Sequence, residues 1–140
     1  MTEKEFLALG PREQDAAVAI ARGEEKPIWT LMKGEWVGTI FNVLSRDECS
    51  PNEDHGLLGW LKEGGLGVRV VPFFVTDIAT AWELVEEMRA ELFSVRLAFS
   101  DALRYMFPCG NEYRAWPDAI FALEPIHICI AYMKAKGAIT

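Results

Sequence analysis

Residues 76–97 read Thr-Asp-Ile-Ala-Thr-Ala-Trp-Glu-Leu-Val-Glu-Glu-Met-Arg-Ala-Glu-Leu-Phe-Ser-Val-Arg-Leu, and this stretch decides which fold the sequence predicts. In its first part, apolar residues recur at steps of three and four, which is the period of an amphipathic helix. Thr76 is a suitable N-cap, and Asp77 favours the positive end of the helix dipole. We expect a helix over residues 77–92 that packs one apolar stripe on a sheet. The stripe consists of Ile78, Ala81, Trp82, Val85, Met88 and Leu92.

The residues that follow change to a period of two. Over residues 93–100, apolar and polar side chains alternate, which is typical of a strand with one buried face. Residues 102–108 repeat the alternation, and Ser100-Asp101 between the two runs suits a turn. We therefore expect two neighbouring strands of a hairpin. Arg96 and Arg104 fall on the more polar faces of these strands.

Three further helices are expected from their start and stop signals. Thr2 can cap a first short helix at the N-terminus. Pro11 suits the first turn of a second helix, and Gly23 ends it. Pro125 starts the last helix, which a cationic turn and Gly137 end.

Strands and loops are expected between these helices. Residues 27–32 and 36–44 are rich in β-branched and aromatic residues, and Lys33-Gly34 between them suits a hairpin turn. A polar loop follows, and then a glycine-rich loop over residues 56–67. A further strand is expected over residues 68–75.

Together these elements predict one domain over residues 1–140. Helices and strands intermix along the chain, which favours an α/β or α+β protein over an all-β protein. The short hairpin connections indicate that much of the sheet is antiparallel. The predicted fold class is therefore α/β (α+β), with an antiparallel-rich sheet covered by helices in an arrangement like an α-β-α sandwich.

The composition restricts the partners and the compartment. Apolar residues make up 51% of the chain, enough for a packed core, yet no apolar run reaches the roughly 18 residues of a membrane span. Acidic residues outnumber basic ones by 21 to 14, and the net charge of -7 opposes binding to a nucleic acid polymer. The N-terminus lacks the apolar stretch of a signal peptide. We expect a cytoplasmic protein that binds neither membranes nor nucleic acid polymers.

The sequence contains no recognisable catalytic or metal-binding motif. Its three cysteines form no Cys-x-x-Cys pair, and His55 has no second histidine at the spacing of metal ligands. Glu86 and Glu87 are adjacent on the expected helix, so they cannot form a close carboxylate pair. We therefore expect neither an enzyme nor a bound metal or other cofactor.

Three cations and one aromatic side chain form the candidate ligand site. On adjacent strands, Arg96 and Arg104 would clamp a phosphate; alternatively, they pair with glutamates of the neighbouring helix. Trp60 lies in the glycine-rich loop, where its ring would stack on a base, and a loop without a ligand is the alternative. Arg114 beside Trp116 would line the rim of the site or form a stacked surface pair. The candidate ligand-binding residues are Arg96, Arg104, Trp60 and Arg114.

Two motifs carry a resemblance to a known family: Thr76-Asp77-Ile78-Ala79 with Trp82-Glu83 and Val85-Glu86, and then Phe93-Ser94-Val95-Arg96-Leu97. They are similar to the phage ABA sandwich domain family of small phage and prophage proteins. The similarity covers residues 76–137, with a weaker match at Glu124-Pro125 and Ile128-Cys129. The resemblance implies an α-β-α layered domain and supplies no active site.

The resemblance also implies a context for function, the cytoplasm of a bacterial host. Some phage proteins of this size neutralise host defence by sequestering small nucleotide signals. The first hypothesis is a non-enzymatic phage or prophage accessory protein that binds a small anionic ligand, such as a nucleotide signal. The alternative is an oligomeric protein–protein interaction module that acts on a host or phage protein. We also expect a homo-oligomer, because one short domain would struggle to bury Trp29, Trp36 and Trp60.

Overall fold

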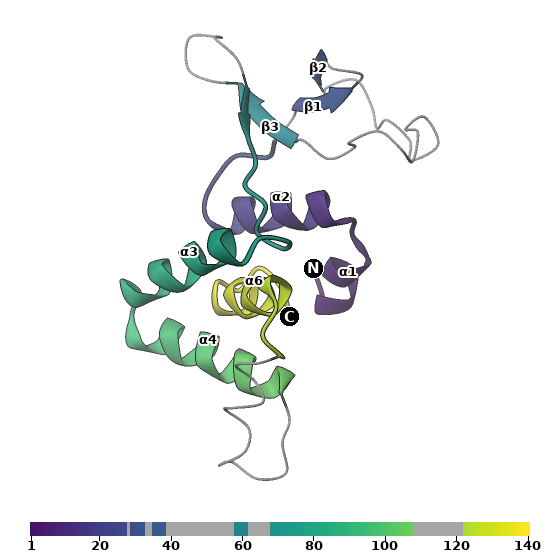
Figure 1. Cartoon of the computed structure of the whole chain (residues 1–140). Coiled ribbons are helices and arrows are strands. Elements are labelled where there is room, and N and C mark those ends of the chain that lie inside the picture. The colour runs from purple at the N-terminus through teal and green to yellow at the C-terminus, as the bar shows by residue number, and fades with distance from the viewer. Residues whose placement is uncertain (28, 33–34, 39–57, 62–67, 108–121) are drawn as a thin grey trace. The chain divides into compact units, whose positions relative to one another are not determined.

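The computed structural model describes residues 1–27, 29–32, 35–38, 58–61, 68–107 and 122–140 (Figure 1). The chain divides into two compact units, which are described separately below. The helical unit comprises Met1–Leu9 and Phe73–Thr140, and the mixed unit comprises Gly10–Pro72. This division does not test the expected single domain over residues 1–140, which stays a prediction.

Helix α6 (Pro125–Ala135) is the centre of the helical unit. All six residues from Ile128 to Met133 are buried. Because a helix has about 3.6 residues per turn, six consecutive residues point in every direction, so α6 is covered on all sides. Figure 1 shows α6 nearly end-on, with the helices α3 (Ile78–Arg89), α4 (Phe93–Met106) and α1 (Glu3–Ala8) around it.

Both ends of α6 follow the local chemistry of the sequence. Pro125 occupies the first turn, where its missing N–H costs nothing. The backbone N–H of Glu124 donates to Nδ1 of His127 at 2.9 Å. Gly137, just beyond the last turn, has a φ of 69°, which other residues rarely adopt. The expected last helix is confirmed.

Helix α3 begins at a side-chain cap and packs against α6. The carboxylate of Asp77 accepts hydrogen bonds from the backbone N–H groups of Ala79 and Thr80, at 3.3 and 3.2 Å. The cap therefore lies one residue later than the sequence predicted. Between the two helices, the hydroxyl of Tyr132 donates to Oε2 of Glu87 at 2.9 Å.

The buried face of α3 is rotated from the expected one. Ala81, Leu84 and Met88 are buried, whereas Ile78 is exposed and Trp82 is 45% exposed. Two apolar stripes run along this helix, and the expected stripe mixes members of both. The expectation that Trp82 fills the core is wrong.

Helix α4 replaces the two strands that the sequence predicted over residues 93–100 and 102–108. It runs without a break for 14 residues and packs against α6, with Phe99 and Ala102 buried. Val95 is its one β-branched residue, and the stretch contains neither Gly nor Pro. A composition of this kind favours a helix over a strand.

Helix α1 is tied to the C-terminal residues of the helical unit. The expected N-cap at Thr2 is confirmed, and Thr2 and Glu5 form a capping box by exchanging hydrogen bonds. Glu3 forms an ion pair with Lys134 of α6. The backbone N–H of Glu3 also donates to the carbonyl oxygen of Thr140 at 2.9 Å. The first helix and the end of the chain are therefore joined by both side-chain and backbone bonds.

The mixed unit contains helix α2 (Pro11–Ala21) and a small antiparallel sheet. The sheet has the strand order β2-β1-β3-β4. Its strands are β1 (Trp29–Met32), β2 (Glu35–Gly38), β3 (Leu58–Leu61) and β4 (Val68–Val70). Trp29 pairs with Gly38 on one side and with Gly59 on the other. The expected antiparallel pairing of these two strands is confirmed for residues 29–32 and 35–38, whereas the predicted turn at residues 33–34 and residues 39–44 lie outside the described residues.

Two other expectations for this region are corrected. The expected glycine-rich loop over residues 56–67 contains strand β3, while its other residues lie outside the described ones. The strand expected over residues 68–75 ends at Val70, and residues 74–76 form a turn.

A buried charge fastens α2 to the chain that leaves β4. Asp15 is fully buried, and Nη1 of Arg12 donates to its Oδ2 at 2.5 Å. The same guanidinium donates to the carbonyl oxygens of Val71 and Pro72, at 2.5 and 3.3 Å. Because the guanidinium of Arg12 pairs with its negative charge, the carboxylate of Asp15 can be buried at a moderate cost in free energy.

The fold class that the sequence predicted is wrong. The described part of the chain is mostly helical, and its strands have only three or four residues and all lie in the mixed unit. In the described part of Phe73–Thr140, every regular element is a helix. Neither an antiparallel-rich sheet covered by helices nor an α-β-α sandwich describes this protein.

Candidate functional site

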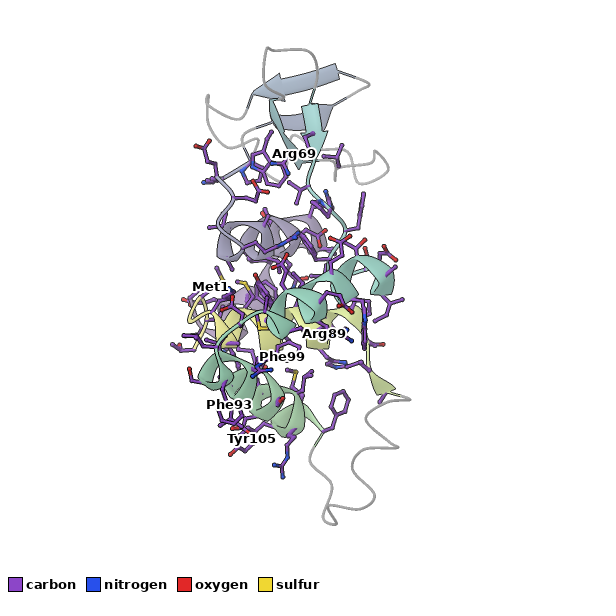
Figure 2. The ribbon with its side chains drawn as sticks, turned by 90° about the vertical axis from the view of Figure 1, so that its left-hand side faces the viewer. Met1, Arg69, Arg89, Phe93, Phe99 and Tyr105 are labelled. Atoms are coloured by element: carbon purple, nitrogen blue, oxygen red, sulfur yellow. The ribbon has the colours of Figure 1, made fainter. Side chains whose placement is uncertain are left out.

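The outer side of α4 carries large apolar side chains that the fold leaves in water. Phe93 is 71% exposed, Leu97 is 47% exposed and Tyr105 is 82% exposed. Phe99, by contrast, is buried. Figure 2 shows Phe93 and Tyr105 on the side of α4 opposite to Phe99.

The spacing of these residues places them, together with two arginines, on the outward half of the helix. Leu97 follows Phe93 at i+4, and Arg104 follows Leu97 at i+7, so the three form a row along the helix. Arg96 lies on one flank of this row and Tyr105 on the other, and both arginines are exposed. We call these five residues the α4 outer face.

The α4 outer face is basic although the chain is acidic. Helix α4 has two arginines and a single acid, Asp101, whereas the whole chain has a net charge of -7. On the neighbouring helix α3, acids outnumber bases, and Arg89 pairs with Glu86 at 3.2 Å. The two consecutive helices therefore differ in the sign of their charge.

Helix α4 begins without a side-chain cap and exposes apolar surface there instead. Leu92 occupies the N-cap position and makes no side-chain hydrogen bond to the first turn. Ser, Thr, Asp or Asn at this position would satisfy a backbone N–H. Leu92 is instead 75% exposed, next to the exposed ring of Phe93. Departures of this kind from local rules are expected where a surface has a function.

The end of α4 is fixed to α6 by an aromatic contact. The rings of Phe107 and His127 lie with their centroids 4.9 Å apart, edge to face. His127 is itself held, because its Nδ1 accepts the hydrogen bond from the N–H of Glu124. With its inner face also packed on α6, α4 presents its outer face from a firmly held element.

The structure brings Arg96 and Arg104 together on one helix, and the strands expected to carry them do not form. Eight residues separate the two positions, which corresponds to about 12 Å along the helix axis. This separation suits two anionic groups better than one phosphate. Their role as ligand-binding residues stays a prediction.

Trp60 belongs to the mixed unit, where it is buried on β3. Its Nε1 donates to the carbonyl oxygen of Glu25 at 2.7 Å, and the guanidinium of Arg69 lies 4.2 Å from the ring centroid. Arg69 also donates two hydrogen bonds to the carboxylate of Glu24, and these bonds lower the pKa of Glu24. The ring face that the sequence assigned to a base is therefore in contact with an arginine of the same unit.

The other candidate residues add no site to the described part of the chain. Arg114, His55 and two of the three cysteines lie outside the described residues. Cys129 is buried, and its thiol donates to the carbonyl oxygen of Phe74 at 3.4 Å. Among the described residues, no group of three or more His, Cys, Asp or Glu is placed to hold a metal ion.

Sequence reasoning missed the apolar half of the α4 outer face, although the sequence holds a signal for it. At a helical period, the stretch has apolar residues on two opposite sides. Phe99 and Ala102 mark the inner side, and Phe93, Leu97 and Tyr105 mark the outer side. A helix needs only one apolar side to pack against a core, so the second side is a candidate binding surface.

Comparisons with known proteins give this surface no assignment. No family model matches the chain, and neither a curated protein nor a solved structure matches it. The resemblance to the phage ABA sandwich domain family therefore stays an expectation. No helix in the described ranges is both long enough and apolar enough to cross a membrane.

Proposed function

We propose that this protein is a protein-interaction module that binds a partner through the α4 outer face. The observation that supports this is the exposure of Phe93, Leu97 and Tyr105 on one face of a well-packed helix. Fully burying an apolar side chain of this size is favourable by about 1.5–3 kcal/mol. Contiguous exposed apolar surface on a soluble protein commonly marks an interaction site.

The residue types on this face also favour a protein partner. Aromatic residues and arginine are enriched at the centres of protein interfaces, and they contribute most of the binding energy. Tyr105 combines an apolar ring with a hydroxyl group, and Arg96 adds charge at the edge. Because α4 is already packed on α6, binding would cost little ordering of the backbone.

A small anionic ligand, the first hypothesis from the sequence, has less support. That site required the guanidinium groups of Arg96 and Arg104 to converge with the ring of Trp60. Instead the arginines lie about two turns apart on one helix, and the Trp60 ring contacts Arg69. The alternative hypothesis needs only an extended surface. A phage or prophage accessory protein acting on a host or phage protein would fit this function, and that origin depends on the resemblance alone.

Selection from a library of displayed peptides tests the proposal. The full chain is the target, and the variant Phe93→Ser/Leu97→Ser serves for counter-selection. We expect enriched peptides that bind the wild type at least tenfold more tightly than the variant, because the variant lacks both apolar anchors. Circular dichroism and thermal melting show whether the variant is folded.

The matched control is Leu7→Ser in α1. Leu7 is 49% exposed, close to the 47% of Leu97, and it lies on another helix. The selected peptides should bind Leu7→Ser as they bind the wild type. If no peptide distinguishes the wild type from the Phe93→Ser/Leu97→Ser variant, the α4 outer face is not a protein-binding surface.

A further inference from the structure

We propose that the partner of the α4 outer face is an acidic amphipathic helix of another protein. The proposal deepens the function proposed above and rests on it. It follows from three properties of the face: its length, its charge, and the poor fit of other occupants.

The length and shape of the face suit one partner helix. From Phe93 to Tyr105 it extends for about 18 Å along the axis of α4, which equals about three helical turns. Side chains one turn apart, such as Phe93 and Leu97, form a ridge that packs into the groove of a facing helix. A partner with apolar residues at i, i+3, i+4 and i+7 would cover this ridge.

The charge of the face requires acids beside the apolar stripe of the partner. Arg96 lies in the first half of the face and Arg104 lies in its second half. Acids two helical turns apart on the partner would match both arginines. Arg104 also makes a contact within the chain, so Arg96 is the better residue for a test.

A second copy of the same face is a poor occupant. A two-fold pair of α4 outer faces would bring together two arginines from each copy, and helix α4 has only one acid, Asp101, that could pair with them. The like charges of the arginines would repel each other across that interface. Charge complementarity therefore favours a partner that supplies the missing acids.

Membranes and nucleic acids are also poor occupants. Both bind proteins through clusters of cations, and this face has only two. Both present an extended anionic surface, which the net charge of -7 of the chain would repel. A single helix is only about 10–12 Å wide, so it can contact α4 alone.

Fluorescence anisotropy with synthetic peptides provides the test. The probe is a labelled helical peptide of about 18 residues with a leucine stripe flanked by glutamates. Two comparison peptides carry lysine in place of every glutamate, or the same acidic composition in scrambled order. Each is titrated with the full wild-type chain and with the variants Arg96→Glu, Arg89→Glu and Leu97→Ser.

We expect the acidic amphipathic peptide to bind the wild type most tightly. Arg96→Glu should weaken this binding about tenfold and should strengthen binding of the lysine peptide, because the sign of the local charge is reversed. Leu97→Ser should weaken the binding of both the acidic amphipathic peptide and the lysine peptide. Arg89→Glu is the matched control, because it changes the net charge equally on the exposed surface of α3 and should have less than a threefold effect.

Several outcomes would overturn the proposal. Equal losses of peptide affinity in Arg96→Glu and Arg89→Glu would show that only the net charge matters. Binding of the scrambled peptide as tight as that of the amphipathic peptide would show the same. Self-association that Leu97→Ser abolishes and Arg96→Glu spares would assign the face to a second copy. Binding to phosphatidylserine vesicles without peptide binding would assign it to a membrane.

The selection described above separates this inference from the proposed function. If selected peptides require Phe93 and Leu97 but are neutral or basic, the function stands and the acidic partner is wrong. If no selected peptide requires these residues, the proposed function itself fails.

Discussion

Helices α6 and α4 pack against each other, but the fold uses their apolar residues differently. In α6, every residue from Ile128 to Met133 is buried. In α4, Phe99 and Ala102 are buried, while Phe93 and Tyr105 lie on the opposite side in water. Apolar residues in a helix therefore do not by themselves indicate the core. In α6 they are packed in the core, whereas in α4 Phe93, Leu97 and Tyr105 remain exposed to water.

The largest expected effect separates the two helices directly. Ile128→Ala in α6 should lower the free energy of unfolding by about 2–5 kcal/mol, because it leaves a cavity in a fully covered site. Leu97→Ala in α4 should lower it by less than about 1 kcal/mol, since half of that side chain is already in water. Chemical denaturation monitored by circular dichroism measures both. Similar losses from the two substitutions would show that the outer face of α4 is part of the core.

Helix α3 offers the same comparison within one element, with a smaller expected effect. Trp82→Ala should cost about 1–2 kcal/mol, less than the 3–5 kcal/mol of a buried tryptophan, because 45% of the residue is exposed. Leu84→Ala, at a fully buried position of the same helix, should cost about 2–5 kcal/mol. The same denaturation experiment compares them. A larger loss from Trp82→Ala would restore the stripe that the sequence predicted.

The ends of most helices were predictable because they depend on neighbouring residues. The capping box at Thr2, Pro11 in a first turn, and the glycines at Gly23 and Gly137 all act as the sequence indicates. Each signal involves residues within one turn of a helix end. Knowledge of the tertiary structure is not needed to interpret them.

The faces of the helices were not predictable in the same way. In α4, apolar residues alternate with other residues as they do in a strand, at Phe93, Val95, Leu97 and Phe99. This alternation arises because a helix here has apolar residues on both its outer and its inner side. In α3, the helical period was predicted correctly, but the side of the helix that faces the core was predicted wrongly. Which side of a helix is buried depends on the elements that pack against it, and these come from distant parts of the chain.

The candidate site shows the same limit. Arg96 and Arg104 were identified as functional candidates, but their geometry was derived from strands that do not form. Trp60 was placed in a loop, and it is a buried strand residue beside Arg69. Residue types can suggest candidate residues for a site, whereas the secondary structure determines which of these residues share a surface.

The starts of α3 and α4 give a prediction of moderate size. Leu92→Asp should raise the free energy of unfolding by about 0.5–2 kcal/mol, because a carboxylate at the N-cap can accept a backbone hydrogen bond that Leu92 cannot. Thermal and chemical unfolding measure the change. Leu92→Ala is the control, since it removes the same apolar side chain without supplying a cap. If both variants gain equally, removal of exposed apolar surface explains the gain and the cap does not.

The smallest expected effect is the titration of Asp77. This side chain caps α3, whereas no side chain caps α4. The pKa of Asp77 is lowered because the hydroxyl and the backbone N–H of Thr80 donate to its carboxylate, as does the N–H of Ala79. A pKa below that of the unfolded chain stabilises the fold above the unfolded value, and this contribution is lost as the pH falls through the folded value. NMR titration of the Asp77 carboxyl carbon should therefore give a midpoint below the usual value of about 3.9. Thr80→Ala should raise this midpoint, because it removes the hydroxyl that contributes most. An ordinary midpoint in the wild type would mean that α3, like α4, begins without a side-chain cap.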